Sequence, residues 1–319
     1  MQREAVNAAS LYNSKHQYLV FGQHGNGNGN QDKPTGSDIK KTSAVVQTGK
    51  HREKGYIQMR EGAHMKHYVY GDPYRLFLNT ALGCDARCRY CYLPDLGMGG
   101  EPAYISAEET LSLLRQSEDF VPGPQGTILS LGCYSECWDE VNRPETVKLL
   151  AALTAQGNYL QMATKQAISR EELMNLDTLV QYPGQLGIYL SVPTLSHAGE
   201  LEPGTAPPEA RLAPLRWRAE LKNIYFVLYL KPVLAGITLE DAETYGRLMK
   251  TYDLPAIVGP LLAMDDVGDV LVGEGRLREV DVDESETLKQ HLSPYGRVYI
   301  HSTEIVDELR HSKKGGEIR

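Results

Sequence analysis

Three cysteines lie close together in the first third of the chain, at Cys84, Cys88 and Cys91, in a C-x-x-x-C-x-x-C pattern. Iron–sulfur clusters are held by cysteine thiolates, and most clusters take four of them. Three thiolates can bind three irons of a 4Fe–4S cluster and leave the fourth iron open to another ligand. The spacing therefore predicts a 4Fe–4S cluster whose metal ligands are Cys84, Cys88 and Cys91.

A zinc site is the alternative for these cysteines. Structural zinc takes four ligands, and His64 or His67 could complete a Cys3His set. Zinc sites more often pair their cysteines as two C-x-x-C knuckles, and this stretch has only one. Tyr90, just before the third cysteine, and the apolar run before the first cysteine both favour the cluster. If these cysteines bind zinc, the protein would be a non-catalytic metal-binding module and not an enzyme.

Composition limits the class of protein. The chain has 319 residues, of which 41% are apolar, enough for one large domain or for one barrel with an appendage. Five cysteines, no secretory leader and no apolar run of membrane-spanning length predict a cytoplasmic protein with no membrane segment. The net charge of −8 disfavours DNA as a partner, although it does not exclude a local basic groove.

The chain divides into three parts. Residues 1–55 are polar and include a Gly/Asn-rich run at 22–36, which predicts a flexible arm because too little apolar surface is present to order it. Residues 56–263 alternate between strand and helix patterns, and residues 264–319 form a C-terminal extension. The extension contains a helix pattern at 284–291, a strand pattern at 295–300 and a polar tail, 311–319, that is expected to fray.

The middle part predicts a partial barrel. Short apolar or β-branched runs predict strands, and apolar residues at three-to-four spacing predict helices between them. The predicted strands are 74–82, 127–131, 159–164, 186–192, 224–230 and 256–262, and the predicted helices are 107–116, 143–155, 170–180, 208–221 and 239–251. Six such β/α repeats with right-handed crossovers curl a parallel sheet into a partial (β/α)6 TIM-like barrel. Chemistry in such barrels lies at the carboxyl ends of the strands, where the cysteine loop falls.

Over roughly residues 75–240 the sequence resembles the radical S-adenosylmethionine (SAM) enzymes typified by spore photoproduct lyase. The loop 84–93 is similar to the cluster loop of that family, with tyrosines on both sides of the third cysteine. Four further segments match in the same order, at 131–136, Thr164-Lys165, Ser191 and 202–211. The resemblance implies a barrel of the radical SAM type, with a 4Fe–4S cluster and S-adenosyl-L-methionine as cofactors.

The resemblance also implies roles for single residues. Ser135, Lys165 and Ser191 would bind SAM, since hydroxyl groups and an ammonium can bond its carboxylate and ribose oxygens. Tyr90 would lie beside that cofactor. Cys133 would donate a hydrogen atom to a substrate radical, helped by Tyr92, which makes Cys133, Tyr92 and Tyr90 the candidate catalytic residues.

Two cysteines have a structural alternative. Free cysteines are often buried as small apolar side chains, and this is the alternative for Cys133. Cys137 follows four residues later and is either a second thiol of the site or a packing residue, with packing favoured.

Departures from the lyase pattern concern the parts that face the substrate. The lyase carries basic residues after its sixth strand, whereas this chain has the acidic segment 264–269 there. Tyr134 replaces a small threonine next to the candidate donor Cys133, and the long N-terminal part does not match. The cofactor machinery is therefore expected to be retained and the substrate to differ.

Three functions follow as hypotheses. The first is a lyase-type radical SAM enzyme that generates a 5′-deoxyadenosyl radical, abstracts a substrate hydrogen, and cleaves or rearranges a C–C bond. Its substrate would be a ribosomally made peptide, as in spliceases that excise tyramine, or else another macromolecule or a small molecule. The implied partners are a small recognition protein and an external flavodoxin- or ferredoxin-type electron donor. The second is repair of a thymine photoproduct in DNA, and the third is the metal-binding module.

Overall fold

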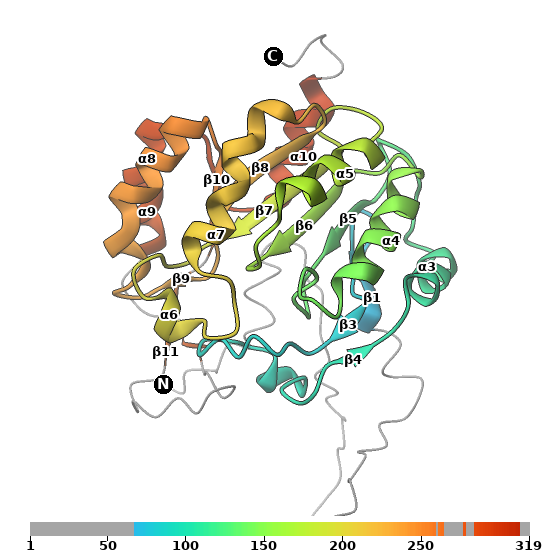
Figure 1. Cartoon of the computed structure of the whole chain (residues 1–319), viewed down its shortest axis with the longest axis horizontal. Coiled ribbons are helices and arrows are strands. Elements are labelled where there is room, and N and C mark those ends of the chain that lie inside the picture. The colour runs from blue at the N-terminus through green and yellow to red at the C-terminus, as the bar shows by residue number, and fades with distance from the viewer. Residues whose placement is uncertain (1–66, 260, 265–276, 279–283, 313–319) are drawn as a thin grey trace, which may run out of the picture.

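The computed structural model describes residues 67–259, 261–264, 277–278 and 284–312. Its centre is an eight-stranded sheet in the order β1-β2-β5-β6-β7-β8-β10-β13 (Figure 1). Every neighbouring pair is parallel except β1 and β2. The strands are β1 (Val69–Gly71), β2 (Arg75–Leu78), β5 (Ile128–Leu131), β6 (Leu160–Thr164), β7 (Leu186–Ser191), β8 (Ile224–Leu230), β10 (Ala256–Val258) and β13 (Val298–Tyr299). The predicted α/β partial barrel is confirmed.

Helices cover the outer face of the sheet (Figure 1). They are α3 (Ala107–Gln116), α4 (Arg143–Thr154), α5 (Arg170–Leu179), α7 (Pro208–Leu212) with the 3-10 helix η2 (Ala213–Glu220), α8 (Ala242–Tyr252) and α9 (Glu284–Leu292). The register places Met162, Ile188 and Phe226 side by side on this face, where they pack in the main core. α3 begins with a capping box in which Ser106 and Glu109 bond each other's backbone amides.

One further helix, α10 (Ser302–Ser312), packs on the inner face and was not predicted. Its Ile305 contacts the cluster that contains Tyr189 and Val227, and its Val306 packs with Ile128 and Tyr159. These contacts lie toward the amino ends of β5 and β6, so α10 closes that end of the barrel. His311 and Ser312, expected in a frayed tail, belong to this helix.

Small elements gather after the carboxyl ends of the strands. They are β3 (Ala81–Leu82) paired with β4 (Ala103–Tyr104), the sheet of β9 (Val233–Leu234), β11 (Leu261–Met264) and β12 (Leu277–Arg278), the helix α6 (Ala198–Leu201), and the 3-10 helices η1 (Pro94–Leu96) and η3 (Thr238–Asp241). They form the surroundings of the cysteine loop, which runs from β3 to η1.

Several predicted elements are shorter or divided, among them the helix predicted at 239–251, which begins as η3 and continues as α8, and the strand predicted at 295–300, which is only β13. The strand predicted at 74–82 breaks between β2 and β3, where the Asn79 side chain accepts a hydrogen bond from the Tyr134 amide at 2.9 Å. The helix predicted at 208–221 contains Pro214, which cannot continue an α-helix, and it becomes α7 and η2. The strand predicted at 256–262 divides after Val258, next to Gly259.

Some expectations concern residues outside the described part of the chain. These are the flexible arm at 1–55, the ligand candidate His64, and the acidic residues Asp265, Asp266 and Asp269. Among the described helices, none combines the length and apolar character needed to cross a bilayer.

Candidate functional site

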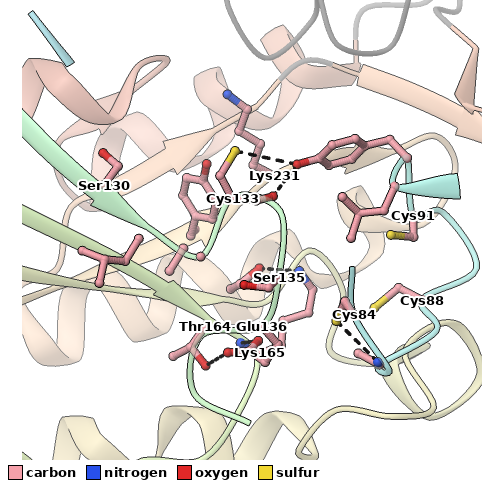
Figure 2. Close-up of a pocket in the computed structure, with 18 of the residues that line it drawn as sticks. Cys84, Cys88, Cys91, Ser130, Cys133, Ser135, Glu136, Thr164, Lys165 and Lys231 are labelled. Carbon is pink, nitrogen blue, oxygen red and sulfur yellow. Dashed lines mark hydrogen bonds between the residues drawn. The ribbon is translucent and has the colours of Figure 1, made fainter. Parts of the chain in front are cut away.

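A pocket opens at the carboxyl ends of β2, β5, β6, β7 and β8, where the barrel arrangement predicts it (Figure 2). All three cysteines of the loop line it. So do the other predicted site residues: Tyr90, Tyr92, Cys133, Ser135, Lys165 and Ser191. The structure therefore brings every predicted site residue to one pocket.

The cysteine loop places three thiols on one wall. Cys88 is buried, while Cys84 and Cys91 are partly exposed. A turn brings the Cys91 amide to the Cys88 carbonyl at 3.0 Å, and the Cys84 Sγ accepts a hydrogen bond from the Ala86 amide at 3.4 Å. Burial raises the pKa of Cys84 to about 11 and that of Cys88 to about 12. Binding metal must therefore release protons, because the thiolate is the ligand.

The donor set fits an iron–sulfur cluster. In the described residues, no three His, Cys, Asp or Glu side chains surround one point as ligands of a single metal ion. In a 4Fe–4S cluster, however, each protein sulfur binds a different iron. His67 packs edge-on against the Tyr134 ring, with 6.2 Å between ring centroids. Three thiols on one loop, facing one pocket, suit a cluster with one open iron.

A buried ion pair holds this loop from behind. Arg211 of α7 and Glu202 are both almost completely buried, and the Arg211 Nη1 lies 2.6 Å from the Glu202 Oε2. The other oxygen of Glu202 accepts a hydrogen bond from the Tyr90 hydroxyl group. Gly204 donates its amide to the Ala86 carbonyl at 3.0 Å, and a Cβ at Gly204 would lie only 2.6 Å from the Ala86 Cα. The segment 202–211 thus fixes the position of the cysteine loop.

The polar residues expected to bind SAM lie next to the loop. The Lys165 Nζ donates to the Ser191 Oγ at 2.8 Å and lies 5.8 Å from the centroid of the Tyr90 ring. Ser135 is buried, and its Oγ accepts a hydrogen bond from the side-chain Nδ2 of Asn142 at 3.4 Å. These side chains come from the ends of β5, β6 and β7, and they can bind a carboxylate and hydroxyl groups together.

Glu136 organises the turn after β6. Its carboxylate accepts hydrogen bonds from the Thr164 hydroxyl at 2.5 Å, the Lys165 amide at 2.8 Å and the Trp138 amide at 3.0 Å. Burial raises the pKa of Glu136, and these three donors oppose that shift. Glu136 therefore positions Lys165 through the backbone.

Cys133 lies just past β5, between two tyrosines. The Tyr92 hydroxyl donates to the Cys133 carbonyl oxygen at 2.6 Å and lies 3.8 Å from its Sγ. The Tyr70 hydroxyl, on β1, donates to the same Sγ at 2.8 Å. Burial raises the pKa of Cys133, which keeps the thiol protonated at neutral pH. A protonated thiol is the form that can give a hydrogen atom.

Aromatic stacking explains the tyrosine at position 134. The Tyr70 ring stacks between Phe77 and Tyr134, with centroid distances of 4.9 and 4.6 Å. A small residue at 134 would leave one face of Tyr70 uncovered. Tyr134 therefore supports the tyrosine that contacts Cys133.

Cys137 is placed differently from Cys133. Its side chain is only 3% exposed, packs in the main core and contacts the Ala163 carbonyl at 3.4 Å. It does not line the pocket. The position agrees with the packing role favoured from the sequence.

Sequence reasoning missed three residues of the pocket region. Tyr70 lies on β1, a strand that no sequence pattern indicated. Arg75, the first residue of β2, and Lys231, just past the carboxyl end of β8, also line the pocket. A charged residue after the carboxyl end of an apolar strand is the signal that could have found Lys231, because such ends form the site in parallel barrels. No such signal marks Arg75.

Comparisons with known proteins bear on the fold. No model of a known protein family matches the chain, and no curated protein matches its sequence. A spore photoproduct lyase variant with bound AdoMet and dinucleoside spore photoproduct is similar in structure, with a TM-score of 0.53 and 16% identity over 71% of this chain and 76% of that chain. Streptococcus suis SuiB bound to precursor peptide SuiA gives a TM-score of 0.51 and 14% identity over 82% of this chain and 59% of that chain.

Both similar proteins are radical SAM enzymes. At these identities the likeness concerns the fold, and the chain spans little more than half of SuiB. The match to the lyase agrees with the resemblance found in the sequence. The chain therefore has the partial barrel of the radical SAM type, in a diverged form similar to that of spore photoproduct lyase.

Proposed function

We propose that this protein is a radical SAM enzyme that cleaves or rearranges a C–C bond in a ribosomally made peptide. The observation that carries the proposal is the meeting of three groups in one pocket: the thiols of Cys84, Cys88 and Cys91, the Lys165–Ser191 pair, and the Cys133 thiol. Each group alone has a structural alternative. Together they supply a place for a cluster, for its cofactor and for a hydrogen donor.

Cys84, Cys88 and Cys91 would hold a 4Fe–4S cluster, and Ser135, Lys165 and Ser191 would hold SAM at its open iron. When bound and reduced by an external flavodoxin- or ferredoxin-type donor, this pair supplies a radical that abstracts a hydrogen atom from the substrate. Tyr90 forms the wall under the Lys165 ammonium. Cys88 and Tyr90 are buried and limit the access of water to that side of the pocket.

Cys133 would return a hydrogen atom to the substrate. The Tyr70 hydroxyl donates a hydrogen bond to the Cys133 sulfur, and the Tyr92 hydroxyl donates one to the Cys133 carbonyl oxygen. In this arrangement neither hydroxyl accepts a hydrogen bond from the S–H group. The S–H group is then left to point at a substrate in the pocket.

Two observations support a peptide as substrate. The chain carries eight more acidic than basic side chains, whereas proteins that track DNA phosphates need a basic surface. One similar structure, SuiB, is bound to a precursor peptide. A peptide can be held at a strand edge or by a small recognition partner without a basic groove.

Repair of a thymine photoproduct is the second candidate. The observation that favours it is the placement of Cys133 and Tyr92 in a pocket of a fold like that of the lyase. Photoproduct reversal by the purified protein would decide for it.

Anaerobic reconstitution tests the proposal. We expect about four irons per chain, as a 4Fe–4S cluster requires, and an electron paramagnetic resonance signal of the reduced protein that changes when SAM is added. Replacing Cys84, Cys88 or Cys91 with Ala removes one of three protein ligands and should abolish the signal, whereas Cys137→Ala should keep it. Stoichiometric zinc without iron would refute the cluster.

A further inference from the structure

Cys133 contacts a tyrosine that is not part of the pocket lining. The Tyr70 hydroxyl donates to the Cys133 Sγ at 2.8 Å, while Tyr70 itself does not line the pocket. Cys133 does line it, and Figure 2 shows its sulfur away from the thiols of Cys84 and Cys88. The sulfur therefore has the pocket on one side and the Tyr70 hydroxyl group on another.

Tyr92, the tyrosine that the sequence resemblance pairs with Cys133, is placed differently. Its hydroxyl donates to the Cys133 carbonyl oxygen at 2.6 Å and lies 3.8 Å from the sulfur. The Tyr70 oxygen is the closer of the two to the sulfur. A hydroxyl group that donates to sulfur directs its hydrogen at that atom, so the Tyr70 hydrogen already points at the Cys133 Sγ.

The fold holds Tyr70 in this position. In the antiparallel pair of β1 and β2, Tyr70 lies directly opposite Phe77, and the two rings stack with 4.9 Å between their centroids. The Tyr134 ring stacks on Tyr70 at 4.6 Å, and the Tyr134 amide is fixed by its hydrogen bond to the Asn79 side chain. The Tyr70 ring therefore needs no rotation to present its hydroxyl group to the sulfur.

The thiol and the phenol both keep their hydrogens at neutral pH. Burial is the main cause that raises the pKa of Tyr70 well above its usual value, and burial also raises the pKa of Cys133. A neutral thiol thus lies beside a neutral phenol. The S–H bond of a thiol and the O–H bond of a phenol are similar in strength, so a hydrogen atom can pass between them with little change in energy.

A thiol that gives its hydrogen atom to a substrate becomes a sulfur radical on the pocket wall. Such a radical faces the product that it has just formed and can take the hydrogen back. Transfer of the unpaired electron to a ring outside the pocket lining would prevent this reverse reaction. Tyr70 meets both requirements, because it contacts the sulfur and does not line the pocket.

We propose that Tyr70 gives a hydrogen atom to the Cys133 sulfur after Cys133 has given its own to the substrate, and that the unpaired electron then rests on the Tyr70 ring. This inference rests on the proposed function for the role of Cys133 as hydrogen donor. The transfer between the two side chains itself requires neither the cluster nor SAM.

The steps balance as follows. The S–H bond of Cys133 breaks, its hydrogen atom bonds to the substrate carbon, and one unpaired electron stays on the sulfur. The O–H bond of Tyr70 then breaks, a new S–H bond forms, and the unpaired electron moves to the Tyr70 oxygen and ring. One electron from the external flavodoxin- or ferredoxin-type donor and one proton from water restore the Tyr70 hydroxyl group. Tyr134 contacts Tyr70 and also His67, edge-on at 6.2 Å, so a series of rings leads away from the sulfur for that electron.

A photochemical experiment forms the sulfur radical without substrate or SAM. The full-length protein with Cys137→Ala, reconstituted and oxidised, is alkylated at Cys133 with phenacyl bromide, and peptide mass spectrometry confirms the modified residue. Irradiation of the frozen sample breaks the C–S bond homolytically and leaves a radical on the Cys133 sulfur. On annealing we expect the electron paramagnetic resonance spectrum of a tyrosyl radical, which should narrow in protein that contains ring-deuterated tyrosine.

Variants assign the radical to one tyrosine. Tyr70→Phe keeps the ring contacts and removes only the hydroxyl group, so the tyrosyl yield should fall about tenfold or more, because the donor in contact with the sulfur is lost. Tyr92→Phe should keep most of the signal, since the Tyr92 hydroxyl donates to the carbonyl oxygen. Tyr295→Phe is the matched control and should leave the yield unchanged, because Tyr295 stacks on His291 and does not line the pocket. Melting curves confirm that each variant is folded.

A second protein makes the test independent of the cluster. Replacing Cys84, Cys88, Cys91 and Cys137 with Ala leaves Cys133 as the one cysteine of the chain, and the same photolysis should again give a radical that depends on Tyr70. This protein also serves if phenacyl bromide modifies the loop cysteines of the reconstituted form.

Two results would overturn the inference: an equal tyrosyl yield in a folded Tyr70→Phe protein, or loss of the signal in Tyr92→Phe with its retention in Tyr70→Phe. Iron content is measured on the reconstituted samples. A radical that depends on Tyr70 in a protein that takes up no cluster would refute the proposed function alone. A bound cluster with no such radical would refute this inference alone.

Discussion

The Cys133 thiol differs from the Cys137 thiol in what surrounds it. Cys133 contacts two tyrosine hydroxyl groups and lines the pocket, whereas Cys137 packs in the main core. The two cysteines are four residues apart in the turn that follows β5. Whether a cysteine of this turn can take part in chemistry thus depends on the side of the turn that its sulfur faces. Cys137 therefore serves as the control for substitutions of Cys133.

Cys133→Ala should separate the first chemical step from the last. We expect the variant still to cleave SAM to 5′-deoxyadenosine and methionine, because Cys133 does not belong to the cofactor side. Without the thiol, the substrate radical should be trapped by solvent species or reductant, and mass spectrometry should show altered products. Cys137→Ala should give the normal product. Normal product at normal yield from Cys133→Ala would instead assign Cys133 to packing.

Lys165 is the charged contact expected for SAM. Its Nζ lies 2.8 Å from the Ser191 Oγ and is within 4.0 Å of the Glu202 carboxylate. Lys165→Ala should weaken SAM binding by about 1.5–3 kcal/mol, the usual contribution of a hydrogen bond to a charged group. Calorimetric titration of the reconstituted protein measures this loss, with the exposed Lys148→Ala as the matched control. An unchanged dissociation constant would remove Lys165 from the cofactor site.

At the scale of elements, the segment 202–211 determines where the cysteine loop lies. It connects β7 to β8 in sequence, yet its Glu202 and Arg211 hold Tyr90 from the loop after β3. This contact joins parts of the chain more than 100 residues apart. The cysteine loop is consequently supported by tertiary contacts, since its local contacts among the described residues are few, such as the Cys88–Cys91 turn and the hydrogen bond from the Ala86 amide to the Cys84 sulfur.

Glu202→Gln should destabilise this support. Removing one partner of a buried ion pair leaves the other charge unpaired and typically costs about 3–5 kcal/mol. We expect that loss in the free energy of unfolding, measured with denaturant on protein without a cluster, and slower iron uptake on reconstitution. Glu200→Gln is the matched control, because Glu200 pairs with Arg89 at the surface, where such pairs contribute about 0–1 kcal/mol. Equal effects of both substitutions would contradict the structural role of the buried pair.

The regular β/α repeats were predictable from the sequence because the spacing of their apolar residues matches the side chains that the fold buries. Strands such as β7 and β8 are apolar along their length, and helices such as α3 carry both an amphipathic pattern and a capping box. The break within 208–221 follows from Pro214 in hindsight. α10 could not be predicted in the same way, since its buried side depends on the inner face of a barrel formed by distant strands.

The candidate site was predictable where the chemistry is local. Cys84, Cys88 and Cys91 share one loop, and Lys165 and Ser191 stand at strand ends that parallel packing brings together. The contact of Tyr70 with Cys133 spans 63 positions and depends on stacking with Phe77 and Tyr134. A contact between residues so far apart leaves no periodic pattern in the sequence, so Tyr70 was not predicted.

For the molecule as a whole, charge decides between the two substrates. The net charge is −8, and the basic side chains that line the pocket are Arg75, Lys165 and Lys231. Three cations inside one pocket cannot follow a phosphate backbone over several nucleotides. DNA binding depends on several phosphate contacts at once and weakens steeply as salt rises.

We therefore expect no salt-sensitive binding to duplex DNA at physiological ionic strength and no reversal of a dinucleotide photoproduct. A cognate precursor peptide should bind measurably, with a recognition partner present if the peptide alone is too weak. Fluorescence anisotropy with labelled duplex and labelled peptide, each measured over a salt series, compares both ligands on one scale. Micromolar DNA binding that weakens as salt rises, together with photoproduct reversal, would contradict the peptide proposal and make DNA the substrate. The protein surface would then have to carry a basic face that the pocket residues do not supply.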